Sequence, residues 1–319
     1  MRRIIVRVAV GALLVLVAMI PLGPVAGRPS QLPPACQDLA FSTEEDFVTW
    51  GPEPPDGNPV ISDGDLLSSS ATAGCIICAR NAQLLAVFDV PFDLGLDAAD
   101  VIDAEGALVA FSTELDSPNS SPESIQFTAG DLLATNGVVI ANVALPHHFE
   151  VRHDIGLDAV HFVGDPVRIG GFLQEATQYT RQDWVLDPGK LADLLAEPYD
   201  IDIWFSTEGT HGPVDSPVIL DGDLLSVRSG KIASNEFLLP GTVPSGIPVR
   251  GVDFGLDAVT DARVPEGQLM RFSTELLFDG EPSFTDGDVL QAGNGVVAKN
   301  SDLVACFEPR AGELGLDAL

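Results

Sequence analysis

The sequence predicts an all-β protein built from four tandem units of about four strands each, because two motifs recur in a fixed order. The string Phe-Ser-Thr-Glu begins at Phe41, Phe111, Phe205 and Phe272. A Gly-Asp-Leu-Leu element, with Val for the first Leu in the last copy, follows at Gly64, Gly130, Gly222 and Gly287. Self-similarity of this kind is the signature of a repeat architecture.

Two further landmarks complete each unit. An Asn inside a short apolar stretch stands at Asn81, Asn142, Asn235 and Asn300. The sequence Gly-Leu-Asp-Ala then begins at Gly95, Gly156, Gly255 and Gly315. This order divides a single domain over 39–319 into units at about 39–103, 104–164, 199–262 and 263–319.

The landmarks lie on strand-like sequence, in which apolar and polar residues alternate with a period of two. In the segment 201–208, the side chains of Ile203 and Phe205 fall on one face and those of Trp204 and Glu208 on the other. The repeated Phe is therefore expected in the core, facing away from the repeated Glu. Turns such as Asp63-Gly64 separate the strands.

One insertion, at about 165–198, interrupts the repeat. Asp187 and Pro188 are typical of a helix start, so a short helix is expected over 190–197, with the rest of the insertion irregular. Insertions in repeat proteins map to one face, often the binding face. The segment is thus a candidate recognition element, and the alternative is a neutral surface decoration.

The repeat is circularly shifted, because the chain ends at Leu319 directly after Gly-Leu-Asp-Ala, the element that elsewhere precedes Phe-Ser-Thr-Glu. In a radial β-fold this shift lets the last strand complete the first sheet and protects its edge. The expected architecture is a closed β-propeller-like ring. An array of small β-sandwich-like units is the alternative.

The first 27 residues follow the order of an export signal. Arg2, Arg3 and Arg7 precede an apolar run over 8–23, and small residues follow up to Gly27. The run is shorter than the roughly 20 residues that span a bilayer. We therefore expect a signal peptide at 1–27, a linker at 28–38 and a secreted or periplasmic mature chain without a transmembrane segment.

The chain is acidic, with a formal net charge of −31. A nucleic-acid partner is excluded on this ground, because phosphate binding needs positive charge. An acidic surface favours solubility, and it also suits calcium.

Four cysteines in an exported chain predict two disulfides. Three pairings are possible. A bridge between Cys36 and Cys306 would lock the ring closed and would leave Cys75 paired with Cys78.

The histidines His147, His148, His153 and His161 gather in the second unit, and a surface cluster without a ligand is the expectation. His147 and His148 would point to opposite faces if they lay on a strand. We find no motif of a nucleophile elbow, a zinc protease, a phosphate loop or a dinucleotide site, so no catalytic residue is predicted.

Three carboxylates recur in every unit and are the candidate metal ligands. They are Glu44, Glu114, Glu208 and Glu275; Asp65, Asp131, Asp223 and Asp288; and Asp97, Asp158, Asp257 and Asp317. In one interpretation they hydrogen-bond their own turns and strand ends. In the other they converge on calcium, which binds six to eight oxygens.

The combination of Phe-Ser, Gly-Asp-Leu-Leu, Asn and Leu-Asp-Ala-Leu resembles repeats of secreted or surface-attached bacterial proteins of uncharacterised function, some of propeller type. The resemblance covers the chain from about Ala40 onward. It implies a repeat class and no particular chemistry.

Two functions follow as hypotheses. The first is an exported, non-catalytic binding or structural protein that presents loops of an acidic β-ring to an extracellular protein or glycan. The second is a calcium-dependent propeller-type hydrolase of a sugar, lactone or phosphate ester. Equivalence of the four units favours the first, since an active site usually breaks such symmetry.

Overall fold

The computed structural model describes residues 27–319 except 52, 71–73, 122, 214, 242, 244–251 and 263–268. The predicted export signal therefore lies outside the described residues, apart from Gly27. Within the described part, no helix is both long enough and apolar enough to cross a bilayer.

The described chain is mostly β and forms five small antiparallel sheets. Two sheets have two strands each: β1 (Phe47–Val48) with β2 (Val60–Ile61), and β3 (Leu66–Ser70) with β4 (Gly74–Ala79). Three sheets have the predicted four strands each. These are β5 (Ala99–Asp103), β6 (Leu108–Phe111), β7 (Leu132–Ala134) and β8 (Val139–Ile140); β9 (Val160–Val163), β10 (Asp202–Phe205), β11 (Leu224–Ser226) and β12 (Gly230–Ala233); and β13 (Val259–Ala262), β14 (Leu269–Phe272), β15 (Val289–Gln291) and β16 (Gly295–Ala298).

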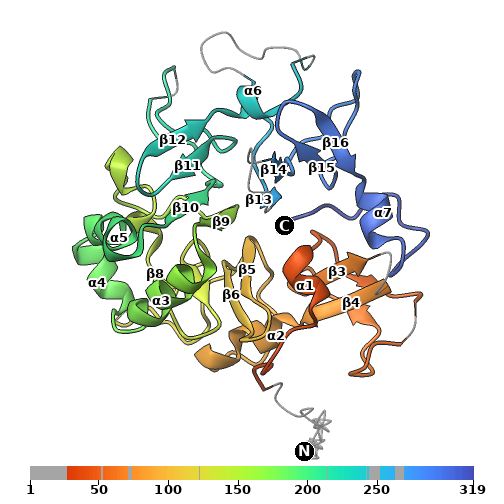
Figure 1. Cartoon of the computed structure of the whole chain (residues 1–319), viewed down its shortest axis with the longest axis horizontal. Coiled ribbons are helices and arrows are strands. Elements are labelled where there is room, and N and C mark those ends of the chain that lie inside the picture. Colours follow the sequence, from red (N-terminus) through yellow and green to blue (C-terminus); the bar gives the residue numbers. More distant parts are fainter. Residues whose placement is uncertain are drawn as a thin grey trace, which may run out of the picture.

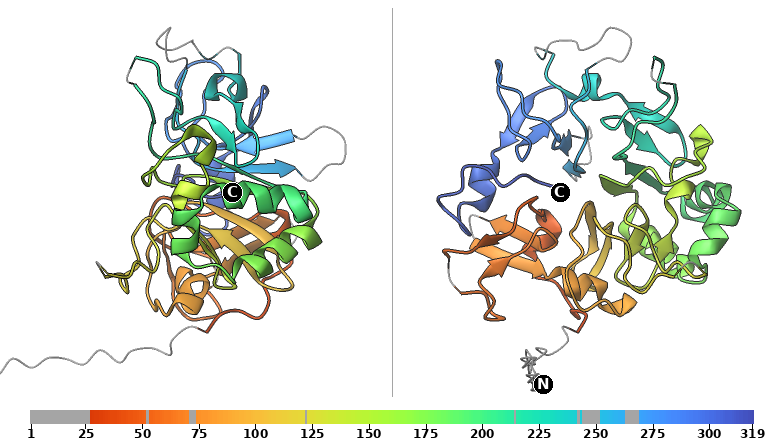
Figure 2. Two further views of the ribbon diagram at one scale, coloured as in Figure 1. Left: turned by 90° about the vertical axis from the view of Figure 1, so that its left-hand side faces the viewer. Right: turned by 180° about the vertical axis from the view of Figure 1, so that it is seen from behind.

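The sheets follow one another in chain order around a common centre, and the C-terminus lies close to that centre (Figure 1). The same circular arrangement is seen from behind in Figure 2. In each four-stranded sheet the strand after Gly-Leu-Asp-Ala comes first and pairs with the strand of Phe-Ser-Thr-Glu. We use the word axis for the line through the common centre.

The end of the chain pairs with its first unit. The N–H of Ser42 donates to the carbonyl oxygen of Ala318 at 3.3 Å. Equivalent bonds inside the other sheets measure 3.0–3.2 Å and join Ser112 to Ala98, Ser206 to Ala159 and Ser273 to Ala258. Leu319 is buried. The shifted repeat thus brings the last residues into the place that β5, β9 and β13 occupy elsewhere.

A second set of bonds links each unit to the next. The Ser hydroxyl of each Phe-Ser-Thr-Glu donates to the Leu carbonyl of the following Gly-Leu-Asp-Ala. The pairs are Ser42 to Leu96, Ser112 to Leu157, Ser206 to Leu256 and Ser273 to Leu316, at 2.5–3.4 Å. Because Leu316 belongs to the chain end that pairs with the first unit, these bonds run through all four units and return to the start.

The repeated Phe forms the core, as predicted. Phe41, Phe111, Phe205 and Phe272 are all 0% exposed. The last two positions of Gly-Asp-Leu-Leu are also buried, for example Leu224 and Leu225. Burying a Phe or Leu side chain contributes roughly 1.5–3 kcal/mol, so the four copies anchor the sheets.

The insertion is helical, and the prediction of a mainly irregular segment was wrong. It contains α3 (Pro166–Ala176), α4 (Arg181–Leu186), α5 (Gly189–Leu194) and the π-helical turn η4 (Leu195–Tyr199). The carboxylate of Asp165 caps α3 by accepting N–H groups of Val167 and Arg168, with Pro166 in the first turn. Asp187 ends α4 instead of capping the next helix, and α5 starts at Gly189.

The helices of the insertion are part of the core. Phe172, Trp184, Leu191 and Leu195 are fully buried in one cluster with residues of the second and third units. Removing 165–198 would therefore expose core side chains, so deletion of the segment does not isolate a role in recognition.

Two disulfides are present, but their pairing differs from the one expected. Cys36 pairs with Cys78 and Cys75 with Cys306, with Cα–Cα distances of 5.9 and 5.5 Å. Cys75 and Cys78 lie three positions apart on β4, about 10 Å along a strand, and on opposite faces, so they cannot bridge each other. The link from the first unit to the last exists, with Cys75 in place of Cys36.

Candidate metal centre

Each Gly-Leu-Asp-Ala segment is held in place by the repeated Asn. Asn81, Asn142, Asn235 and Asn300 are buried, and each begins a short helical turn: α2 (Asn81–Leu84), η2 (Asn142–Ala144), α6 (Asn235–Leu238) and α7 (Asn300–Val304). The side-chain amide of Asn81 donates to the Gly95 carbonyl, and its oxygen accepts the N–H of Leu94. The same pair of bonds recurs at the other three Asn residues. The four segments therefore adopt one conformation.

The Gly of this segment is required for two reasons. Gly156 has a φ of +78°, which disfavours residues with a side chain. A Cβ there would also lie 2.7 Å from the Cβ of Glu208. Gly95, Gly255 and Gly315 repeat both features, against Glu114, Glu275 and Glu44. Each Phe-Ser-Thr-Glu carboxylate is thereby brought close to the Asp two residues after the Gly.

Eight of the twelve predicted carboxylates converge around the axis, and we call them the axial cluster. Its members are Glu44, Glu114, Glu208, Glu275, Asp97, Asp158, Asp257 and Asp317. Asp158, Asp257 and Asp317 are 5–9% exposed, whereas the four Glu side chains are accessible to solvent. Carboxylate oxygens of Glu44, Asp257 and Asp317, drawn from different units, all lie within 4.8 Å of one another.

The protonation equilibria reflect this crowding. Burial, followed by repulsion from neighbouring carboxylates, raises the pKa of Glu114 and of Glu275 to about 7, and that of Asp317 to about 8. Burial, followed by repulsion from Asp257, raises the pKa of Asp158 well above its ordinary value. Burial, followed by repulsion from Asp317 and Glu44, does the same to the pKa of Asp257. Like charges that are buried together resist ionisation.

Buried oxygen atoms in this cluster lack partners. The Oδ2 atoms of Asp97, Asp158 and Asp317 have no hydrogen-bond partner among the residues that the structure describes. An unpaired buried carboxylate costs several kcal/mol. The ionised form of these carboxylates is therefore unfavourable without a counter-charge, and a bound cation would offset that cost.

The geometry suits a hard divalent cation. Calcium binds carboxylate and carbonyl oxygens at about 2.3–2.6 Å, so two of its ligands lie at most about 5 Å apart. The oxygens of Glu44, Asp257 and Asp317 satisfy this limit.

The other four predicted ligands lie in turns away from the axial cluster. Asp131 accepts the N–H groups of Thr128 and Asn142 and pairs with the guanidinium of Arg181 at 2.5 Å. Burial raises the pKa of Asp131, and the bonds from Arg181 act in the opposite direction. Asp65 with Arg80 is arranged alike, and Asp288 accepts the N–H groups of Thr285 and Asn300. Asp223 pairs with Lys231 and accepts the N–H of Leu220, but its Oδ1 has no partner among the described residues. These residues support the turns, and their oxygens are not directed to the axial cluster.

A fourth repeated acid was missed in the sequence. Asp93, Asp154, Asp253 and Glu313 stand two residues before the Gly of each Gly-Leu-Asp-Ala. Their carboxylates accept the N–H of that Gly, and Asp253 also accepts the N–H of Gly222. Repulsion from Asp63 and Asp93 contributes to the raised pKa of Glu114, so these acids extend the negative field around the axial cluster. Their fixed offset from the Gly was a signal available in the sequence.

The histidines do not form one surface cluster, and that expectation was wrong. His147 and His148 lie on the 3-10 turn η3 (His147–Phe149), so their rings stack at 4.8 Å instead of pointing apart. His153 lies near His211, 5.8 Å between ring centroids. His161 is buried, 4% exposed, on β9 between Asp100 and Asp261.

Comparisons with protein-family models, curated proteins and solved structures returned no match. The candidate site is thus defined by its geometry alone.

Proposed function

We propose that the chain is an exported, closed four-bladed β-propeller that binds a calcium ion on its axis and serves as a non-catalytic binding or structural protein outside the cytoplasm. The observation that supports it best is that carboxylate oxygens of Glu44, Asp257 and Asp317, which come from three separate units, lie within 4.8 Å of one another. The Oδ2 atom of Asp317 is also buried without a partner among the described residues. A cation held by several units would fasten them to one another.

The closed ring rests on the bonds that return to the start of the chain. Ser42 binds the carbonyl of Ala318, and Cys75 is bridged to Cys306. In an array of separate β-sandwich-like units, the first and last units would not be expected to form the same Ser-to-Ala hydrogen bond that is found within the other sheets. The disulfides suit an oxidising compartment, which agrees with the predicted export signal.

The test is calorimetric titration of the mature protein, residues 28–319, with calcium chloride. We expect saturable binding with one dominant site, and a rise in melting temperature that chelator reverses. The double variant Asp257→Asn/Asp317→Asn should lose binding at least tenfold, about 1.4 kcal/mol. Asp302→Asn, an exposed acid on α7, is the control and should bind as the parent does. Absence of calcium binding by the folded parent would refute the cation role.

The partner of the first hypothesis is an extracellular protein or glycan. The helices α3 and α4 of the insertion keep its role as a recognition element open, because Val167 and Leu186 are 82% and 74% exposed while the opposite faces are buried. Exchanging Val167 and Leu186 for Lys leaves the core intact. Loss of envelope or glycan capture by that variant, at unchanged melting temperature, is the expected result.

The calcium-dependent hydrolase remains the second candidate because of one observation. The accessible Glu side chains of the axial cluster would let a bound cation contact a substrate as a Lewis acid. Calcium-dependent turnover of a chromogenic sugar, lactone or phosphate ester that Glu114→Gln abolishes would favour it. Absence of turnover by the calcium-loaded protein would contradict the hydrolase and favour the non-catalytic binding protein.

A further inference from the structure

A second polar site lies along the first strands of the sheets, separate from the axial cluster. A cavity of about 170 Å³, partly open to solvent, is lined by residues of α1 (Ala35–Asp38), β3, β5, β13 and β14. Its polar wall consists of Gln37, Asp38, Asp100, Thr260, Asp261 and Arg271. Asp100 stands three residues after Asp97, about 10 Å further along the chain if extended.

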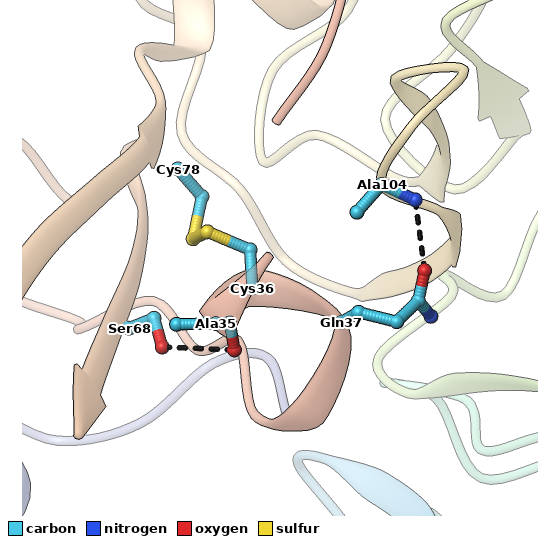
Figure 3. Close-up of a disulfide and its surroundings, with 6 residues drawn as sticks. All are labelled: Ala35, Cys36, Gln37, Ser68, Cys78 and Ala104. Carbon is cyan, nitrogen blue, oxygen red and sulfur yellow. Dashed lines mark hydrogen bonds between the residues drawn. A yellow bond between two sulfur atoms is a disulfide. The ribbon is translucent and has the colours of Figure 1, made fainter. Parts of the chain in front are cut away.

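The helix α1 closes this cavity and is fixed in place. The disulfide from Cys36 to Cys78 ties it to β4, and the hydroxyl of Ser68 donates to the Ala35 carbonyl (Figure 3). On its other side, the amide of Gln37 accepts the N–H of Ala104 and donates to the Val101 carbonyl. The cavity wall is therefore preorganised, which lowers the entropic cost of binding.

The polar groups behind the wall have both signs of charge. His161 lies between two acids, with Nδ1 at 3.3 Å from Asp100 and Nε2 at 3.4 Å from Asp261. The two carboxylates raise the pKa of His161 to about 9 against the opposing effect of burial. The imidazole is thus a cation at neutral pH, and it bridges strands of three sheets.

Arg271 lines the cavity and carries an unsatisfied donor. Its Nε atom is buried, and within the described ranges it has no hydrogen-bond partner. A buried guanidinium N–H without an acceptor costs more than an ordinary unmade hydrogen bond, about 1–3 kcal/mol or more. An anionic oxygen is its preferred acceptor.

The units differ here, in contrast to the axial cluster. Asp100, His161 and Thr260 occupy the same place in three units, two residues after the Ala of Gly-Leu-Asp-Ala. An acid, a base and a hydroxyl at equivalent positions break the repeat where strands of different sheets meet. Unlike groups at these equivalent positions suit a ligand whose two ends differ in charge, whereas the equivalent carboxylates of the axial cluster suit a single cation.

We propose that this cavity binds a small zwitterion, an α-amino acid with a short side chain, whose carboxylate meets Arg271 and whose ammonium group faces Asp100 and Asp261. A simple anion would be repelled by the acids, and a simple cation would be repelled by Arg271 and His161. An apolar cavity of about 150 Å³ accommodates benzene, so 170 Å³ fits a molecule such as alanine or serine, while a hexose is too large.

The test is calorimetric titration of the mature protein with glycine, L-alanine and L-serine. Acetate, ethylammonium and glycerol serve as the anionic, cationic and neutral comparisons. We expect saturable binding of at least one amino acid and none of the three comparisons. Arg271→Gln should weaken that binding at least about tenfold. Arg168→Gln, an exposed arginine on α3, should leave it within about twofold.

A second variant separates binding from folding. Thr260→Leu adds volume at the cavity wall and should abolish binding; melting curves identify which variants are folded. Absence of amino-acid binding to the folded parent would overturn the proposal. Binding of acetate or glycerol as strong as that of alanine would overturn it as well, and so would full affinity in a folded Arg271→Gln variant.

Discussion

Two sets of aspartates repeat with the same period, and their surroundings are opposite. Asp131, from Gly-Asp-Leu-Leu, accepts two backbone N–H groups and pairs with Arg181. Asp158, from Gly-Leu-Asp-Ala, is equally buried, but its Oδ2 has no partner in the described structure and its charged neighbours are acids. An aspartate thus stabilises its own turn in the first motif, whereas in the second motif it is a buried carboxylate without a compensating positive charge.

The largest expected effect separates these two roles directly. Asp131→Ala leaves Arg181 unpaired and two N–H groups without acceptors, so the free energy of unfolding should fall by about 3–5 kcal/mol. Asp158→Asn removes a repelled carboxylate, and in chelator it should leave stability unchanged or raise it. Urea unfolding of both variants measures the difference. Equal losses in the two variants would break the comparison.

The bridge between Cys75 and Cys306 should matter next, because it joins the units that supply Glu44 and Asp317. The variant Cys75→Ser/Cys306→Ser should lose about 2–5 kcal/mol of stability. It should also bind calcium more weakly than Cys36→Ser/Cys78→Ser, whose bridge lies within the first part of the chain. Unfolding curves and titrations test both statements. Equal calcium affinity in the two variants would show that the bridge between Cys75 and Cys306 does not shape the axial cluster.

Asp100 and Asp261 are acids that do have a positively charged neighbour, the imidazolium of His161. Its pKa in the folded protein, about 9, exceeds the ordinary value of about 6.5, so folding takes up a proton between these values. The stabilisation is complete below about pH 6.5 and is lost as the pH rises through 9. The stability difference between the parent and His161→Gln should therefore shrink by up to about 3 kcal/mol from pH 6 to pH 10. A difference that does not vary with pH would contradict the charged pair.

The smallest expected effect concerns the accessible acids of the axial cluster. Glu44 lies beside Asp257 and Asp317, whereas Glu45, next in the chain, is an exposed residue outside the cluster. Glu44→Gln should weaken calcium binding by about tenfold, or 1.4 kcal/mol. Glu45→Gln should change it by less than about twofold. Identical affinities in the two variants would remove Glu44 from the site.

The sequence was sufficient for the features that depend on local pattern. The alternation around Phe205 placed it in the core, and the shifted order of motifs anticipated the contact between Ser42 and Ala318. Local pattern also contained the start of α3 at Asp165 and Pro166, which was overlooked.

Features that depend on contacts between units far apart in the chain could not be predicted from the sequence. The repeat marks Asp158 as one of four equivalent residues, but it does not say that it lies just before β9 with acids of other units as its neighbours. The pairing of Cys75 with Cys306 likewise follows from the circular arrangement, since the two residues are 231 positions apart. The position of His161 between acids of two other units has the same origin.

The proposed calcium site can be observed in a crystal structure of the mature protein grown with calcium, with an anomalous difference map to locate the ion. We expect one strong peak among the axial carboxylates, at 2.3–2.6 Å from oxygens that include those of Glu44, Asp257 and Asp317. A map without a peak there, in protein whose axial carboxylates are ordered and hydrogen-bonded to one another, would contradict it.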